Sequence, residues 1–345
     1  MVQGPRRGVG IALGQPSVSA AEALRVGIAA DRAGATMIGV GDGFTDAVAT
    51  LGALSTVTEQ ATLMATVATW TRTPIATAVA VSALQGLSGG RVAVAFGAMP
   101  KAWSEDWHGV DHTRPVARMR DFIGAVRQAY EAPDGVPRDH DGPFYRFAGY
   151  RRLAPPTGHP LRVWIAATGA KMTELGGEAA DGLLMNVMCS PEWVRETSLP
   201  AIARGAASAR RASPVGRAAM VYTAIGDDEQ EAIDRARPGI AFYFRTPYFH
   251  DVLRWHGFER ELAAGLDAMA RGDEDALVAS VSDEMVTTFS LAGSRRSVLD
   301  RLRVHAAIYD WIELAPPVGL DEPTTVGLLE QIVAAIPDMN DVFLH

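Results

Sequence analysis

Strand-like apolar runs alternate with helix-like stretches along the whole chain, and this alternation constrains the fold more than any other feature. Eight runs are expected to be strands, at residues 8–13, 36–42, 61–68, 90–96, 161–167, 181–188, 218–225 and 309–316. Each strand is followed by a stretch with helical periodicity or a helix-opening proline. Such alternation indicates a parallel sheet. Eight units over 345 residues predict an α/β fold closed as a (β/α)8 TIM barrel.

Two segments do not fit this repeat. Residues 132–160 are irregular and lie between the fourth and fifth units, and residues 246–284 read as one or two extra helices between the seventh and eighth units. No stretch of the sequence has the composition of a linker between domains. We therefore expect a single domain over residues 1–345 with two insertions.

The composition excludes several classes of function. A net charge of −8 argues against a nucleic-acid or anionic-membrane surface. The single cysteine, Cys189, excludes a disulfide framework and a cysteine-based zinc cluster, and we expect it to be a buried small hydrophobe. No apolar run approaches the length of a membrane span, and the N-terminus lacks a signal-peptide core. We therefore expect a soluble, cytoplasmic protein whose partner is a small molecule.

Common catalytic and nucleotide-binding motifs are missing. The sequence GVGIALG at residues 8–14 is not G-x-G-x-x-G, and its first glycines open a strand instead of following one. The sequence also contains no P-loop and no G-x-S-x-G motif. His108 and His112 have i, i+4 spacing, but their segment runs into Pro115 and offers no evident third ligand, so we predict no metal site.

Small residues gather where the predicted strands end, which is the functional end of such a barrel. They would let a flat ring approach the backbone and let a phosphate meet the N–H groups of a helix N-terminus. Asp42 is the ionisable exception, and it either caps the next turn or contacts a cofactor or substrate. With so few ionisable groups, the site suits a cofactor that carries the chemistry itself. The two lysines of the chain, Lys101 and Lys171, follow the fourth and fifth strands. Lys171 is either a functional residue or simply a solvent-exposed residue in the first turn of a helix.

Several segments resemble the bacterial luciferase-like family. TRTPIATAVAVSALQGLSGGRVAVAFGA (71–98) is similar to that family's proline-opened helix, LSGGR turn, strand and glycine turn. Residues 141–186 are similar to its next block, with a short hairpin, a strand that ends in small residues and the sequence AADG. DEMVTTFSLAGSRRSVLDRL (283–302) with WIELAPP (311–317) is similar to its C-terminal end. The resemblance runs from about residue 8 to residue 336 and implies a luciferase-like barrel.

Within the family, the sequence most resembles the branch that uses the deazaflavin coenzyme F420. The resemblance implies an oxidoreductase that transfers a hydride between the deazaflavin C5 and a small organic substrate. It matches Asp42 to an acid at the end of strand two, and Ala65–Thr66 or Thr66–Val67 to a non-prolyl cis peptide in a strand-three bulge behind the ring. The turn after strand five would lie against the cofactor side chain and phosphate. The implied cofactor-binding residues are Asp42, Ala65, Thr66, Val67, Gly97, Ala98, Ala166, Ala167, Thr168, Gly169, Lys171 and Asn186.

Two positions depart from the pattern of that branch. Some members carry a catalytic histidine directly after the strand-two acid, where this chain has Gly43. Some carry a glutamate after strand four, where Pro100 is the nearest match. The sugar-phosphate dehydrogenase chemistry of those members is therefore not carried over, and the catalytic residue stays unassigned. The candidates for a proton donor or a pocket wall are Trp70, Trp103, Glu105, His108 and His112.

Two alternatives stay open. The chain could be an FMN-dependent monooxygenase, in which reduced flavin activates oxygen, or a non-catalytic protein that binds a flavin or deazaflavin. The family also implies a homodimer. Aromatic residues near segments 103–114 and 246–284 point to an apolar or ring-bearing substrate; they are Trp107, Tyr243, Phe244, Tyr248, Phe249 and Trp255.

Overall fold

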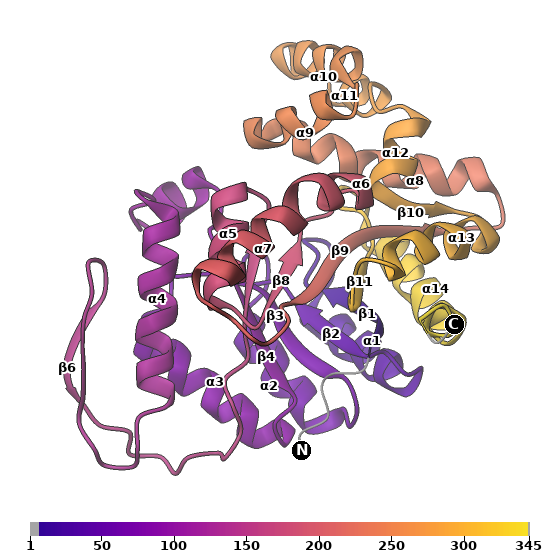
Figure 1. Cartoon of the computed structure of the whole chain (residues 1–345). Helices are drawn as coiled ribbons and strands as arrows, with labels where there is room; N and C mark the ends of the chain where they lie inside the picture. Colours follow the sequence, from indigo (N-terminus) through magenta and orange to yellow (C-terminus); the bar gives the residue numbers. More distant parts are fainter. Residues whose placement is uncertain (1–6, 344–345) are drawn as a thin grey trace.

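A closed parallel barrel forms the centre of the protein in a computed structural model that describes residues 7–343 (Figure 1). Within these residues the barrel consists of eight strands that pair in parallel in the order of the chain. The last strand pairs back onto the first through Val9 and Ile312, which closes the barrel. The predicted (β/α)8 fold is therefore confirmed. The barrel strands are β1 (Gly8–Leu13), β2 (Met37–Val40), β3 (Thr62–Ala68), β4 (Val92–Gly97), β7 (Val163–Ala167), β8 (Gly182–Met185), β9 (Gly216–Ile225) and β11 (Trp311–Ala315).

Large side chains close the barrel where its strands begin. Met37, Met64, Trp164 and Trp311 belong to one buried cluster, and the rings of Trp164 and Trp311 stack with centroids 5.1 Å apart. Because side chains alternate along a strand, the residues two positions further on also point inward. At β1 and β2 these positions are taken by glycine, as at Gly39, where side chains of other strands occupy the space that a Cβ atom would fill. Because large side chains fill the end where the strands begin, we expect a ligand site at the other end, where the strands finish.

Helices cover the outside of the barrel, and local sequence explains where they begin and end. The Thr73 side chain accepts the backbone N–H of Ala76, and Pro74 occupies the first turn of the helix that follows β3. Gly89 ends that helix with φ of 65°, a conformation that favours glycine. The covering helices are α1 (Ala20–Arg32), α2 (Ala47–Val57), α3 (Pro74–Ser88), α4 (Pro115–Tyr130), α5 (Ala170–Ala179), α7 (Leu199–Ser208), α8 (Glu229–Phe242), α13 (Arg295–Ala306) and α14 (Glu322–Asp341).

A ninth strand, β10 (Ser290–Gly293), joins the same sheet and was missed by the sequence analysis. The long strand β9 explains its place. The first half of β9 pairs with β8 and β11, whereas its last residues, Tyr222 to Ile225, pair with β10. Four residues carry too little periodicity to be distinguished from a loop.

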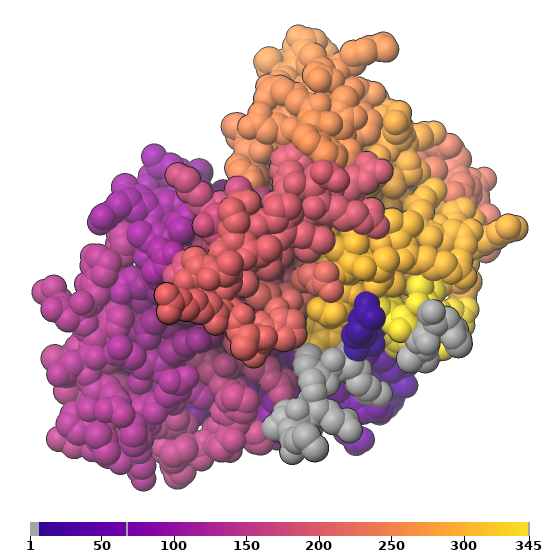
Figure 2. Space-filling model, viewed as in Figure 1, coloured from indigo at the N-terminus to yellow at the C-terminus, as the bar shows by residue number. Residues whose placement is uncertain are grey.

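The segment between β9 and β10 forms a helical lobe, coloured orange at the top of Figure 1 and seen as a protrusion in Figure 2. It contains more helices than the one or two expected from the sequence. Its core is apolar and includes Phe244, Phe249, Leu253, Phe258 and Phe289. After α8 its elements are the 3₁₀ turns η3 (Tyr243–Arg245) and η4 (Pro247–Phe249), followed by α9 (His250–Trp255), α10 (Glu259–Arg271), α11 (Glu274–Ala279) and α12 (Asp283–Phe289).

The irregular segment 132–160 contains an antiparallel hairpin of β5 (Arg138–Asp141) and β6 (Arg146–Tyr150), which lies outside α4 (Figure 1). Asp121 of α4 holds the hairpin, because its carboxylate accepts the ring N–H of His140 at 2.7 Å and the backbone N–H groups of Phe144 and Tyr145. No helix within residues 7–343 is long and apolar enough to cross a membrane.

Candidate functional site

The predicted cofactor-binding residues lie in the last part of five neighbouring strands or just after them, at one end of the barrel. The strand register pairs Val40 with Ala65, Gly97 with Ala166, and Ala167 with Met185. Asp42 and Asn186 therefore stand at the two ends of an arc that follows β2, β3, β4, β7 and β8. The small residues of this arc leave its backbone open to a ligand.

Strand β3 carries an irregularity within this arc. Its register with β4 shifts between Thr66 and Ala68, so that an extra residue lies between the partners of Ala95 and Phe96. The family resemblance places a bulge at this point of strand three. Bulges bend a strand and are frequent beside active sites. Thr66 is buried, whereas Val67 is described by its backbone alone.

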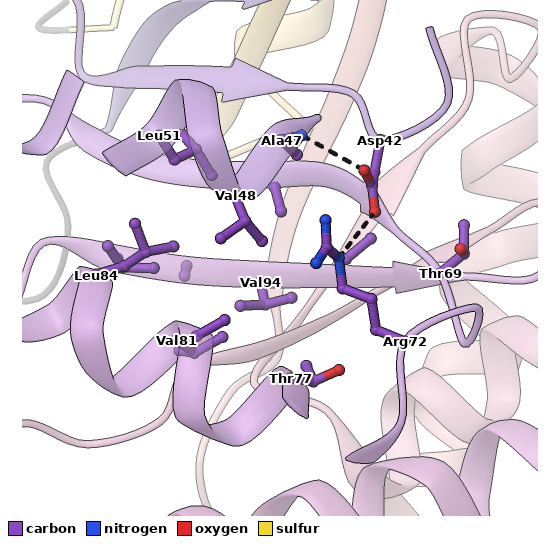
Figure 3. A pocket seen from close by; sticks show the side chains of 15 residues that line it. Asp42, Ala47, Val48, Leu51, Thr69, Arg72, Thr77, Val81, Leu84 and Val94 are labelled. Atoms are coloured by element: carbon purple, nitrogen blue, oxygen red, sulfur yellow. Dashed lines mark hydrogen bonds and ion pairs between the residues drawn. The ribbon is translucent and has the colours of Figure 1, made fainter. Parts of the chain in front are cut away.

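Asp42 is partly buried at the end of β2, with its neighbours on α2 and in the loop before α3 (Figure 3). One carboxylate oxygen accepts the backbone N–H of Ala47 at 3.4 Å, and the other lies 3.9 Å from Nε of Arg72. Burial raises the pKa of Asp42, while the Ala47 N–H and Arg72 oppose that shift. The carboxylate thus caps the turn before α2, and Arg72, which the sequence analysis did not single out, is its ionic partner.

The cavity below Asp42 is too small for a ring. It lies between β3 and β4 on one side and α2 and α3 on the other, with apolar walls that include Val48, Val81 and Val94 (Figure 3). Its volume is about 20 Å³, which is room for about one water molecule. A cofactor or substrate near Asp42 would therefore contact the barrel rim and not enter this space.

A larger cavity, of about 170 Å³, opens where β7 ends and α5 begins. Within residues 7–343 no side chain caps the first turn of α5 after Gly169, and the first N–H groups of a helix have no partner within the helix. Two buried polar atoms beside this cavity, Oγ1 of Thr173 and Nε1 of Trp193, have no hydrogen-bond partner among the described residues. The cavity is lined by Thr168, Ala170, Thr173, Trp193, Thr197, Ser198 and Tyr248.

These groups form a site suited to an anion. N–H groups at a helix N-terminus and the positive end of its dipole attract negative charge. Partial burial raises the pKa of Tyr248 to about 12, so its hydroxyl keeps the proton it can donate. A Cβ atom at Gly169 would lie 3.2 Å from that hydroxyl, so glycine allows the close approach of Tyr248. Buried polar groups without partners are rare in folded proteins, and a ligand in this cavity is one way to satisfy them.

The two lysines differ in their surroundings. Lys171 lies in the first turn of α5 and is exposed, with no ion pair within residues 7–343. Lys101 is also exposed, but its ammonium lies 3.8 Å from the Glu105 carboxylate. Of the two, Lys171 is the one placed beside the cavity at α5.

Three aromatic rings stand at the rim after β2 and β4. Trp103 and Trp107 stack with centroids 4.6 Å apart on the short π-helix η1 (Trp103–Trp107), and Phe44 meets Trp103 at 5.6 Å. Trp107 is 58% exposed and Phe44 is half exposed. Exposed aromatic clusters often mark interaction sites, and π-helical turns are frequent at functional positions. This geometry fits Trp103 as a wall of a site and not as a proton donor.

The other catalytic candidates mostly hold the loop before α4. The ring Nε2 of His112 bonds the carbonyl oxygen of Met99 at 2.9 Å, and the Glu105 carboxylate accepts the backbone N–H of His112 at 3.3 Å. Trp70 is buried against His112, and its indole N–H lacks a partner in the described part of the chain. His108 is exposed. Residues 7–343 contain no group of three or more side chains that could hold a metal ion.

The lobe contributes fewer aromatic side chains to the site than the sequence suggested. Phe244 and Phe249 are buried in the core of the lobe, and neither lines the two cavities described above. Tyr248 does line the α5 cavity. The hydroxyl of Tyr243 accepts a hydrogen bond from the Asn186 side chain at 3.3 Å, which ties the lobe to the end of β8.

Sequence analysis also missed Glu313, an acid inside the barrel. It is fully buried in β11, and its Oε1 accepts the hydroxyl proton of Thr66 at 2.7 Å. Burial raises the pKa of Glu313 to about 8. A lone glutamate within the apolar run WIELA was the available signal.

Comparisons with known proteins give a consistent set of similarities. A family model described as luciferase-like monooxygenase matches residues 6–309. The 5,10-methylenetetrahydromethanopterin reductase of Archaeoglobus fulgidus is 28% identical over 265 residues, which cover 74% of this chain and 76% of that protein.

Two solved structures share the fold. The coenzyme F420-dependent tetrahydromethanopterin reductase of Methanopyrus kandleri superposes with a TM-score of 0.81 at 22% identity, covering 96% of this chain and 99% of that one. The oxygenating constituent of 3,6-diketocamphane monooxygenase of Pseudomonas putida, solved with FMN, superposes with a TM-score of 0.69 at 14% identity, covering 96% and 98%.

Proposed function

The chain belongs to the luciferase-like monooxygenase family, and on that premise we propose that it is an F420-dependent oxidoreductase. The proposed reaction transfers a hydride between the deazaflavin C5 and a small organic substrate. The chain is an enzyme of this family, so the proposal concerns which cofactor it uses and which chemistry it performs.

The cavity at the start of α5 carries this proposal. F420 bears a phosphate, and the cavity offers free helix N–H groups and the Tyr248 hydroxyl. The buried Thr173 hydroxyl and Trp193 indole N–H have no other partner among the described residues. The residues present therefore fit the phosphate of such a cofactor.

The small residues of the strand ends would hold the rest of the cofactor. From the phosphate site, the arc of strand ends leads past Ala166 and Gly97 to the β3 bulge at Thr66. Bound F420 would supply a hydride donor or acceptor at its C5. The chain itself would bind and orient the cofactor and keep water from its buried face. Asp42 and Arg72 would contact the ring or the substrate from the end of β2.

The aromatic cluster of Phe44, Trp103 and Trp107 supports a substrate that is apolar or ring-bearing. Its exposed rings stand after β2 and β4, on the same rim as the proposed ring site. The unpartnered indole N–H of Trp70 could hydrogen-bond an oxygen of such a substrate, as a donor that stays neutral. We also propose a homodimer from family membership, which light scattering coupled to size exclusion tests.

FMN is the second candidate, because a monooxygenase solved with FMN shares the fold. Titration of the purified protein with F420 and with FMN separately, followed by fluorescence, discriminates between them. We expect F420 to bind with micromolar or better affinity and FMN to bind at least tenfold more weakly. Micromolar FMN affinity without F420 binding would overturn the proposal. Oxygen consumption with reduced FMN would identify the monooxygenase, and cofactor binding without turnover of any substrate would favour a non-catalytic carrier.

A further inference from the structure

Glu313 lies inside the barrel with one of its oxygens unused. In β11 it pairs with Gly10 of β1 and Met220 of β9. Its side chain is fully buried, and Oε1 accepts a 2.7 Å hydrogen bond from the Thr66 hydroxyl of β3. Oε2 has no partner within residues 7–343. Barrel interiors are normally filled by apolar side chains, so an acid at this depth requires an explanation.

The backbone leaves room for this particular pair. A Cβ atom at Gly39 of β2 would lie 1.6 Å from Oε1 of Glu313 and 2.5 Å from the Thr66 hydroxyl oxygen. Any other residue at position 39 would displace the carboxyl group. The glycine of β2 thus leaves space for the hydrogen bond between Glu313 of β11 and Thr66 of β3.

Burial keeps the acid neutral near pH 7. The residues that face it from β1, β2, β3 and β9 are Gly10, Gly39, Thr66 and Met220, none of which carries a charge. Burial raises the pKa of Glu313 to about 8, and the Thr66 hydrogen bond opposes this shift. Since Oε1 accepts from Thr66, the proton belongs on Oε2.

Thr66 is the residue at which the β3 bulge begins, and its backbone also reaches the end of β2. The register of β3 shifts between Thr66 and Ala68. A Cβ atom at Gly41 would lie 3.2 Å from the Thr66 carbonyl oxygen, which places Thr66 against the residue before Asp42. A displacement of Thr66 would therefore move both the bulge and the strand end that carries Asp42.

We propose that Glu313, through its hydrogen bond with Thr66, holds the β3 bulge in the position that the cofactor requires, and so acts as a positioning residue. This inference rests on the proposed function, because the bulge matters for catalysis only if a cofactor ring packs against it. Glu313 itself need not touch the cofactor or the substrate.

Four variants test this role by F420 titration at pH 7 and pH 9. Glu313→Ala and Thr66→Val both remove the hydrogen bond, and we expect each to weaken F420 binding about tenfold at pH 7. Combining them should weaken binding no further than either alone, because they remove the same contact. Glu313→Gln keeps a neutral acceptor for the Thr66 hydroxyl, so it should bind F420 within about twofold of wild type.

The two pH values separate positioning from a general loss of structure. Wild type should bind F420 more weakly at pH 9, where Glu313 ionises, whereas Glu313→Gln should show a smaller change. If wild type binds F420 and Glu313→Ala binds it equally well, the positioning role of Glu313 is overturned while the proposed function stands. The same conclusion follows if Glu313→Gln is as impaired as Glu313→Ala. A wild-type protein that binds no F420 overturns the proposed function instead.

Discussion

Two regions at the same rim of the barrel differ in whether their polar groups have hydrogen-bond or ionic partners. At the end of β2, Asp42 is engaged by the Ala47 N–H and by Arg72, and the adjoining cavity holds about one water molecule. At the end of β7, the cavity of about 170 Å³ keeps the Thr173 hydroxyl and the Trp193 indole N–H unpartnered within the described chain. Satisfied groups stabilise the fold, whereas unsatisfied buried groups cost stability until a ligand meets them. On the proposed function, the first region would serve mainly the fold and the second would bind the cofactor.

The largest expected effect is on the free energy of unfolding and arises at Glu313, the most deeply buried of the unsatisfied groups among the described residues. Its pKa of about 8 in the folded protein lies above its ordinary value of 4.5. The folded state therefore retains a proton that the unfolded chain releases between these values. Its contribution to stability is fully present below pH 4.5, and it falls by about 1.4 kcal/mol per pH unit as the pH rises towards 8.

Glu313→Gln removes this titration and isolates its effect. Measured by denaturant unfolding from pH 5 to 9, the free energy of unfolding of Glu313→Gln relative to wild type should increase up to about pH 8 and then level off. A difference that does not vary with pH would show that Glu313 is ionised in the folded protein.

Thr173→Val should separate stability from binding. Valine has a similar shape but no hydroxyl, so the variant should be as stable as wild type or up to about 1 kcal/mol more stable. F420 affinity should fall about tenfold, because a hydrogen bond to a charged phosphate is lost. Thermal unfolding without ligand and fluorescence titration with F420 measure the two quantities.

Thr197 provides the matched control in the same cavity. Its hydroxyl already donates to the backbone oxygen of Trp193 at 2.6 Å. Thr197→Val should therefore cost about 1 kcal/mol of stability and change F420 affinity by less than about threefold. Equal affinity losses in the two variants would remove the distinction between satisfied and unsatisfied hydroxyl groups.

Asp42→Ala should give a smaller loss of affinity than Thr173→Val, of about fivefold, since on the proposed function Asp42 would contact both its protein partners and the cofactor. Its stability should fall by about 1 kcal/mol through loss of the Ala47 N–H contact. Asp46→Ala serves as a control, because Asp46 also pairs with Arg72 and caps α2 but is exposed. Unchanged F420 affinity in Asp42→Ala would make Asp42 a structural residue only.

The smallest change in F420 affinity is expected on substitution of Lys171. The side chain is exposed, so water and salt screen its attraction for a phosphate. Lys171→Ala should weaken F420 binding by no more than about threefold at low salt and by less at 0.5 M salt. Lys101→Ala, at the other lysine, should leave affinity unchanged at both salt concentrations. A tenfold loss in Lys171→Ala would mean that the lysine and not the helix terminus dominates the site.

Sequence periodicity was sufficient to predict the eight strands of the barrel but not the ninth strand that joins the sheet. The eight barrel strands follow from alternation that extends over the whole chain. The four residues of β10 join the sheet only because β9 continues beyond its other partners. Phe244 and Phe249 illustrate the same limit, since the aromatic residues of a surface segment either line a pocket or form a core of their own.

The sequence by itself determined the family, the barrel and the strand ends that form the candidate site, because these depend on local periodicity and on short motifs. Only the tertiary structure decided which polar groups are left unsatisfied. Thr173 and Trp193 are 20 residues apart in the chain and border one cavity, and Thr66 and Glu313 are separated by 247 residues yet share a hydrogen bond. Whether a buried polar group has a partner depends on residues brought together by folding, and no local pattern encodes that outcome.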